Sequence, residues 1–138
     1  MVEHAEMGEQ GPAAVATGFY QALSRGDAEA AAQLVNDHFA SDAELIRPGS
    51  LPGGGTIRGV RAIVAFVRAA VSSGATIDVD RVLESTTGEQ TDVIAALSLS
   101  LGQAAMPVLE RWTFVGDRVS RLQAFYFDTA AMVAVAKT

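Results

Sequence analysis

Very few side chains in this sequence can do chemistry. It contains no cysteine, two histidines and a single lysine, Lys137, near the end of the chain. Disulfides, thiolate metal sites and a cysteine nucleophile are therefore excluded, and a terminal lysine is a poor candidate for Schiff-base chemistry. His4 lies in the polar first residues, where we expect no functional role. Acid–base chemistry would therefore fall to carboxylates, tyrosines or His38.

Arg47 is the charged residue whose place in the chain most suggests a binding site. It ends a short apolar run, and Pro48 opens a loop rich in proline and glycine. Loops that follow strand ends commonly carry binding and catalytic groups on a rigid scaffold. Residues 53–55, three glycines, resemble a phosphate-binding turn, but no Gly-Lys-Ser/Thr follows them. We expect a tight turn or a mobile lid there, and we find no motif for a metal or a cofactor.

The apolar periodicity predicts the elements that must position these residues. Residues 13–24 repeat apolar side chains at helical spacing, and after Gly26 a second helix begins, capped by Asp27. A strand over 43–47 and a third helix over 60–71 follow. Four further strands are predicted at 76–86, 91–101, 105–115 and 118–127. This order predicts an α+β fold in which a curved, mostly antiparallel sheet wraps around three helices.

Both faces of the predicted sheet carry large apolar side chains. In strand 105–115, Trp112 lies on one face and Leu109 on the other, and in the last strand Tyr126 and Phe125 alternate in the same way. A sheet that covers a pocket with one face needs a second cover for the other. We therefore predict a homodimer through the outer face of the sheet.

Composition restricts the partners and the location of the protein. A net charge of -6, with a pI near 4.7, argues against nucleic acid, which needs a basic face. No apolar run approaches the roughly 18 residues of a membrane span, so we expect a cytoplasmic protein that does not enter the membrane. Residues 1–12 are polar and acidic, which predicts a disordered tail and leaves 13–138 as a single domain. Residues 129–136 are apolar enough to dock on the sheet or on a partner.

Three segments that together cover nearly the whole chain carry a family resemblance. They are FYQALSRGDAEAAAQLV (19–35), FASDAELIRPGSLPGGGTIRG (39–59) and VLERWTFVGDRVSRLQAFYFD (108–128). They resemble the nuclear transport factor 2-like superfamily, whose cone-shaped fold is shared by ketosteroid isomerases, SnoaL-like polyketide cyclases and limonene epoxide hydrolases. SLPGGGTIRG is most similar to the SnoaL-like branch. The resemblance implies a cone with an internal pocket, and it leaves the activity open because one fold hosts many functions.

The resemblance carries over little of the catalytic machinery of these enzymes. Arg47 stands where ketosteroid isomerases hold their general-base aspartate, and arginine cannot accept a proton. Phe19 takes the place of the tyrosine that donates to the enolate oxygen, and we expect Tyr20 to face another direction and to serve packing. Glu110 keeps a carboxyl at the place of the protonated acid partner. Ala124 stands where limonene epoxide hydrolases have their last aspartate, and the aspartate of the polyketide cyclases has no unambiguous counterpart.

In a cone of this kind, Arg47 and Glu110 would point into the pocket. The guanidinium would favour an anionic or carbonyl oxygen, and a desolvated Glu110 would be an acid–base group with a raised pKa. Tyr126 is the third catalytic candidate because it offers a hydroxyl. The candidate ligand-binding residues are Phe19, Trp112, Leu122 and, again, Arg47. Alternatively, Arg47 and Glu110 form a structural ion pair, or Arg47 turns outward to the loop, and the aromatic residues are simply core.

Two functions fit this pattern. The first is a SnoaL-like acid–base enzyme of the cyclase, isomerase or hydratase type, acting on a hydrophobic, oxygenated molecule such as a polyketide, a terpenoid or a steroid-like compound. The second is a non-catalytic ligand-binding or accessory domain that has kept the pocket and lost the base. Neither function calls for a metal or a cofactor. We expect His38, at the end of the second helix, to interact with the helix dipole and to take no part in either function.

Overall fold

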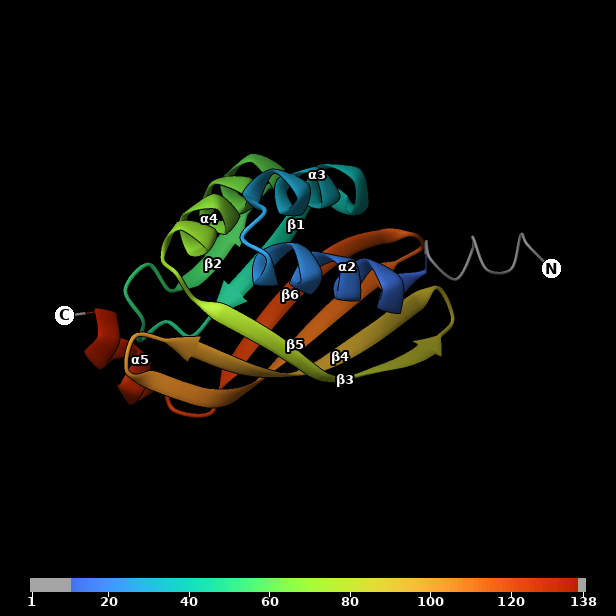
Figure 1. The fold of residues 1–138 in the computed structure, drawn as a ribbon. Coiled ribbons are helices and arrows are strands. Elements are labelled where there is room, and N and C mark those ends of the chain that lie inside the picture. Colours follow the sequence, from blue (N-terminus) through green and yellow to red (C-terminus); the bar gives the residue numbers. More distant parts are fainter. Residues whose placement is uncertain (1–10, 137–138) are drawn as a thin grey trace.

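A computed structural model describes residues 11–136 and shows helices packed against one face of a curved sheet (Figure 1). The helices are α2 (Pro12–Ser24), α3 (Ala28–His38), α4 (Val60–Ser72) and α5 (Thr129–Ala136). The strands are β1 (Phe39–Arg47), β2 (Gly55–Arg58), β3 (Thr76–Thr87), β4 (Gln90–Leu101), β5 (Ala104–Val115) and β6 (Arg118–Tyr126). Within the described residues, no helix is long and apolar enough to cross a membrane. The α+β class expected from the sequence is confirmed.

The sheet has the strand order β2-β1-β6-β5-β4-β3 and does not close into a barrel. β1 and β6 run parallel, and every other neighbouring pair is antiparallel. The register shifts between Val79 and Arg81 in β3 and between Thr113 and Phe114 in β5, and such irregularities bend and twist strands. Helices α2, α3 and α4 lie over the concave face (Figure 1). The predicted arrangement of a curved sheet around three helices is therefore confirmed.

The helix boundaries follow the predicted signals closely. The side chain of Asp27 accepts a hydrogen bond from the backbone N–H of Ala30 at 3.0 Å, which is the expected N-cap of α3. Pro12, the last residue of the tail predicted for 1–12, begins α2. Residues 1–10 lie outside the described residues, so their disorder stays a prediction.

The loop after Arg47 contains an element that the sequence pattern did not reveal. We predicted no strand between Pro48 and the helix over 60–71, but β2 begins at Gly55 and pairs with β1, with Arg47 opposite Gly55. A strand of four residues is too short to show a clear alternation of apolar and polar side chains, so pairing with β1 defines it. The remaining loop is a tight turn, because a Cβ atom on Gly54 would lie 2.0 Å from the Pro48 carbonyl oxygen. Leu51, only 5% exposed, anchors this turn to the core.

The C-terminal apolar segment forms the helix α5, which lies at the end of the sheet near the turn between β4 and β5 (Figure 1). α5 contacts β5, and its Met132 is buried in the hydrophobic core. Docking of residues 129–136 on the sheet was one of the two expectations from the sequence. It closes one end of the space between the sheet and the helices.

The core lies between the concave face and the helices, and Trp112 is at its centre. The Trp112 side chain has no exposed surface. Edge-to-face contacts join it to Phe19 at 5.4 Å, Tyr20 at 5.9 Å and Phe39 at 5.8 Å between ring centroids. Such contacts add to the free energy gained by burying aromatic surface. This cluster fixes α2 and the start of β1 against the sheet, and the cavity described next lies beside it.

Candidate ligand-binding site

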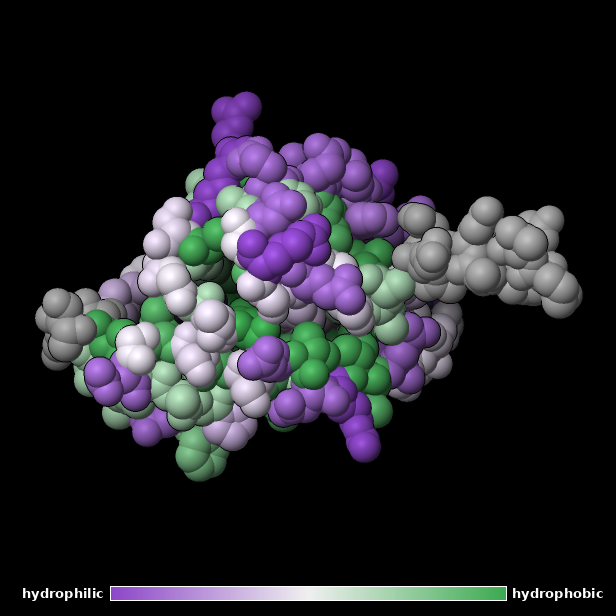
Figure 2. All heavy atoms as spheres, in the orientation of Figure 1, coloured by the Kyte–Doolittle hydropathy of each residue, from purple (hydrophilic) through white to green (hydrophobic). Residues whose placement is uncertain are grey.

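A cavity of about 330 Å³ lies between the concave face of the sheet and helices α2, α4 and α5. Its volume falls in the range of small-molecule sites, which are mostly apolar with a few placed polar groups. Apolar side chains show in a hollow between the helices and the sheet (Figure 2). The apolar lining includes Leu23, Leu45, Val67, Leu99, Leu101 and Met132. This apolar lining is interrupted by three polar side chains that could bind or react with a ligand: Arg47, Glu110 and Tyr126.

Arg47 enters the cavity from the end of β1. Side chains alternate along a strand, so Arg47 follows Leu45 on the face that packs inward. Its guanidinium carbon lies 4.9 Å from the centre of the Phe66 ring, a cation–π contact. Its Nε is buried and has no hydrogen-bond partner. No ion pair within residues 11–136 includes Arg47, so the structure contains neither the alternative ion pair with Glu110 nor an outward-turned Arg47.

Glu110 and Tyr126 come from the adjacent strands β5 and β6. Glu110 is paired with Ala124, and Tyr126 is two residues further along, so the two side chains are diagonal neighbours on the inner face. The small Ala124 between them leaves room for the cavity. Burial raises the pKa of both Glu110 and Tyr126 from their ordinary values, and the Arg47 guanidinium partly offsets both shifts. The two groups are therefore close enough to Arg47 to respond to its charge.

Tyr20 holds Glu110 in place, and this contact was not anticipated. Its hydroxyl donates a hydrogen bond of 2.7 Å to Oε1 of Glu110, and it accepts one of 2.8 Å from Nε1 of Trp112. Burial, followed by the nearby Glu110 carboxyl, raises the pKa of Tyr20 well above its ordinary value, so the phenol keeps its proton. The Trp112–Tyr20–Glu110 chain thus runs from the core to the cavity wall.

Tyr20 is buried in the core and does not line the cavity with Phe19, as expected, but it does more than pack because it also holds Glu110. α2 buries a face wide enough to include both Phe19 and Tyr20, because it is covered by the sheet and also by α3. Phe19 then contacts the cavity, and Tyr20 reaches the carboxyl of Glu110. The sequence indicates only that Tyr20 is buried, because Ala16 and Tyr20 are four residues apart on one helix face, and the structure buries both of them fully.

The other predicted site residues divide into two groups. Phe19 and Leu122 line the cavity, and their contact with a ligand stays a prediction. Trp112 does not, because the rings around it fill the space on its inner side. Its role as a ligand-binding residue is therefore corrected to one of support, through the hydrogen bond to Tyr20. His38 ends α3, away from the residues that line the cavity.

Two curated mycobacterial proteins are similar to this chain in sequence. The uncharacterized protein Mb0035 of Mycobacterium bovis is 34% identical over 119 residues, covering 81% of this chain and 86% of that protein. The uncharacterized protein Rv0034 of Mycobacterium tuberculosis matches with the same identity and coverage. No model of a protein family matches the sequence. These relatives establish kinship in sequence without naming an activity.

Solved structures share the fold over nearly the whole chain. A nuclear transport factor 2-like protein from Burkholderia pseudomallei has a TM-score of 0.68 at 20% identity, covering 90% of this chain and 95% of that one. A Kribbella flavida structure provisionally assigned as a ketosteroid isomerase has a TM-score of 0.65 at 20% identity, covering 84% and 77%. TerC, co-crystallized with polyporic acid, has a TM-score of 0.65 at 19% identity, covering 90% and 96%. At these identities, the similarity establishes the fold alone.

Proposed function

This chain belongs to one family with the mycobacterial proteins Mb0035 and Rv0034 and shares the fold of nuclear transport factor 2-like proteins, and we propose that its cavity binds a hydrophobic, oxygenated small molecule. A polyketide, a terpenoid or a steroid-like compound would suit the apolar walls. One observation carries the proposal: Arg47, Glu110 and Tyr126 converge on a cavity whose other walls are almost entirely apolar. The polar atoms would fix the orientation of the ligand through its oxygen, and the apolar walls would supply most of the binding free energy.

Glu110 is the group best suited to exchange a proton with this ligand. A general acid works best when its pKa is raised towards the operating pH, and burial moves the pKa of Glu110 in that direction. Arg47 and Tyr126 would stabilise negative charge on a ligand oxygen as it develops. The reaction supported by this set is acid–base chemistry of the SnoaL-like type, with Glu110 as the acid.

A second candidate function, binding without turnover, is favoured by one specific observation. Arg47 stands on β1 where ketosteroid isomerases have their base, and Glu110 is the only carboxyl among the described residues that line the cavity. A proton transfer that needs a separate acid and base would therefore lack one of them. In this case the protein would be a ligand carrier or an accessory domain with the same pocket.

Binding can be tested by thermal shift or calorimetry with hydrophobic ketones and carboxylates. We expect Arg47→Ala to abolish the stabilisation by ligand and His38→Ala to leave it unchanged, because only Arg47 lines the cavity. Ala70→Trp, which fills the cavity from α4, should also abolish it. Equal ligand shifts in all three variants would show that the ligand binds elsewhere.

The catalytic role of Glu110 needs a separate measurement once a ligand is turned over. Glu110→Gln keeps the shape of the side chain and an acceptor for Tyr20 but cannot transfer a proton. If Glu110 is the acid, kcat should fall about 100-fold or more while binding persists. Unchanged turnover in this variant would remove Glu110 from the mechanism and leave the binding function in place.

We also propose that the outer face of the sheet forms a homodimer. Large apolar side chains are exposed there. Leu109 on β5 is 50% exposed, Phe125 on β6 49%, Phe127 just after β6 81% and Leu83 on β3 55%. Large apolar side chains that stay exposed on one face often mark a protein–protein interface. Sedimentation should give a dimer mass at micromolar concentration, and Phe125→Lys should shift it to the monomer. A monomer mass for the wild-type protein would overturn this proposal.

A further inference from the structure

The charge balance of the cavity narrows the class of ligand. Arg47 is permanently protonated, its Nε is buried without a partner, and it has no ion-pair partner within residues 11–136. Its closest polar neighbours in the cavity are Glu110 and Tyr126, whose pKa values both respond to its charge. A buried cation costs free energy unless an anion or strong acceptors accompany it. A ligand that brings its own negative charge would meet this need.

The hydrogen-bond chain behind the cavity fixes which oxygen of Glu110 can carry a proton. The indole N–H of Trp112 can only donate, so the Tyr20 oxygen accepts from it. Tyr20 has one proton, and its 2.7 Å bond to Glu110 uses it, so Oε1 of Glu110 is an acceptor. Oε2 has no hydrogen-bond partner within the described residues and is not among the fully buried unpaired atoms. Any proton on Glu110 therefore sits on Oε2, in a side chain that lines the cavity.

Resting on the proposed function, we propose that the ligand is a hydrophobic monocarboxylate that binds as the anion together with one proton. Arg47 and Tyr126 donate hydrogen bonds to the ligand carboxylate, and Glu110 binds in its protonated form and donates to it from Oε2. The ligand carboxylate keeps its charge throughout, and the proton comes from solvent. No covalent bond is made or broken in this binding step.

Electrostatics favours a protonated Glu110 when the anion is bound, because the single positive charge of Arg47 balances only one negative charge. With an anion bound, an ionised Glu110 would place two carboxylates beside a single guanidinium in an apolar cavity, and one of a close pair of carboxylates then takes up a proton. Burial alone already raises the pKa of Glu110 in the free protein. The bound anion would raise it further. Binding is therefore linked to proton uptake wherever free Glu110 is ionised.

Few other groups can alter this linkage. The titratable or charged groups that face Glu110 are Tyr20 from α2, Arg47 from β1 and Tyr126 from β6. Among the described residues, α4, β3, β4 and α5 contribute only apolar side chains to the cavity wall, and the loop after α4 adds Ala75 and the hydroxyl of Ser73. Tyr20 keeps its proton because burial raises its pKa, and burial does the same for Tyr126. Glu110 is thus the one group of this set whose pKa burial shifts upward in the direction of neutral pH.

The proposal can be tested by calorimetry with naphthalene-1-acetate and its uncharged amide, naphthalene-1-acetamide. Between about pH 5.5 and 8.5 the acetate stays ionised, because ordinary carboxylic acids have a pKa of about 4. We expect the acetate to bind at least about tenfold more tightly than the amide at the low end of this range. Its affinity should fall by up to about tenfold per pH unit once free Glu110 is ionised. Titrations in two buffers with different ionisation enthalpies should then report uptake of about one proton per ligand bound.

Glu110→Gln provides the decisive variant. Its amide oxygen can accept from Tyr20 and its NH₂ can donate to the ligand, so it imitates the protonated carboxyl at every pH. We expect it to bind the acetate with an affinity that does not change with pH and without proton uptake. Arg47→Met should weaken the acetate by about 10- to 100-fold, and the amide much less, since it removes a charge-assisted contact.

The outcomes separate this inference from the proposed function. If the acetamide binds as tightly as the acetate, or if wild-type affinity does not vary with pH, the inference is wrong and the binding pocket stands. If the Glu110→Gln variant no longer binds the acetate although circular dichroism shows that the variant is folded, the ligand does not bind the protonated form of Glu110. The inference is then also wrong. If neither compound binds the wild-type protein at millimolar concentration, the proposed function fails together with the inference.

Discussion

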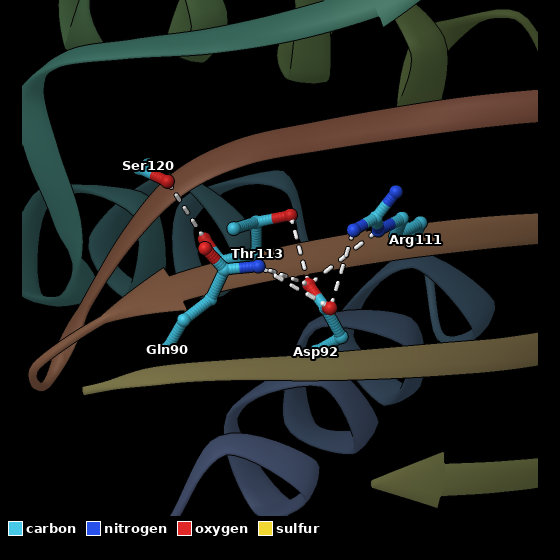
Figure 3. Close-up of polar contacts among 5 residues, drawn as sticks. All are labelled: Gln90, Asp92, Arg111, Thr113 and Ser120. Carbon is cyan, nitrogen blue, oxygen red and sulfur yellow. Dashed lines mark hydrogen bonds and ion pairs between the residues drawn. The ribbon is translucent and has the colours of Figure 1, made fainter. Parts of the chain in front are cut away.

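Glu110 and Asp92 are carboxylates on neighbouring strands of one sheet, and they have opposite surroundings. Asp92, on the outer face of β4, accepts hydrogen bonds from Arg111 at 3.2 and 3.4 Å, from Thr113 at 3.1 Å and from Gln90 (Figure 3). Partial desolvation raises its pKa, but these hydrogen bonds and the charge of Arg111 outweigh that effect, so the pKa of Asp92 is lowered. Glu110, on the inner face of β5, has Tyr20 as its one hydrogen-bond partner within the described residues, and burial raises its pKa.

The difference shows how to tell a structural carboxylate from one that is available to a ligand. The donors around Asp92 leave it little capacity for further hydrogen bonds, and its outer-face network is complete without a ligand. Oε2 of Glu110 accepts no hydrogen bond, and the nearby Arg47 forms no ion pair within the described residues. Sites of perturbed pKa with unused hydrogen-bonding capacity are the ones that point to function.

The largest expected effect contrasts two consecutive residues of β5 that lie on opposite faces. Trp112→Ala should lower the free energy of unfolding by about 3–5 kcal/mol, because it leaves a cavity among four packed rings. Arg111→Ala should cost at most about 1 kcal/mol, since its bridge to Asp92 is partly exposed. Urea denaturation of the two variants measures both values. Similar losses would mean that the outer network supports the fold as strongly as the core.

The second contrast removes one hydrogen bond from each carboxylate. Tyr20→Phe leaves Oε1 of Glu110 and Nε1 of Trp112 without their partner and should cost about 1–3 kcal/mol. Thr113→Val takes a single donor from Asp92, which keeps others, and should cost about 1 kcal/mol or less.

Carboxyl NMR titrations should show the pKa rising in both of these variants. The pKa of Glu110 would rise further above its ordinary value, because the hydrogen bond from Tyr20 lowers it in the wild type. The pKa of Asp92 would rise back towards its ordinary value. A falling Glu110 pKa in Tyr20→Phe would contradict the assigned direction of the hydrogen bond.

The pH dependence of stability should have opposite signs for the two carboxylates. The raised pKa of Glu110 means that the folded protein binds more protons than the unfolded chain above about pH 4.3, so stability falls as pH rises towards the folded pKa. The slope is at most about 1.4 kcal/mol per pH unit. The lowered pKa of Asp92 stabilises the fold above about pH 3.9, and this contribution is lost as pH falls through the folded pKa.

Amide variants separate these two contributions. Glu110→Gln should flatten the decline in stability above about pH 4.3, and Asp92→Asn should flatten the loss in acid. Denaturation series over pH measure both, with each variant serving as the control for the other. If the free energy of unfolding changes with pH in the same way in the wild type and in Glu110→Gln, Glu110 has the same pKa in the folded and the unfolded chain.

The smallest expected effect is the coupling between the two networks. Tyr20→Phe and Asp92→Asn alter networks that share no side-chain partner. Their costs should add to within about 0.5 kcal/mol in the double variant. A larger interaction energy, measured by the same denaturation experiment, would mean that β5 transmits changes from one face of the sheet to the other.

Local patterns predicted much of this protein. Asp27 caps α3 as expected, and the alternation along β5 placed Glu110 and Trp112 on the inner face and Leu109 on the outer. β2 could not be predicted because four residues show too little periodicity. The Tyr20 contact could not be predicted either, since it joins residues 90 positions apart, and only packing brings those together.

The sequence by itself determined which elements form and which side chains share a face, because these depend on periods of 2 and 3.6 residues and on local caps. It also identified the residues able to do chemistry, since so few exist. Only the tertiary structure decided which neighbours and hydrogen-bond partners each of these residues has. Arg47 and Glu110 come from strands far apart in the chain, and β1 and β5 are each paired with β6, which brings both side chains to the same cavity. Burial and partners, which raise one carboxyl pKa and lower the other, exist only once these strands are packed.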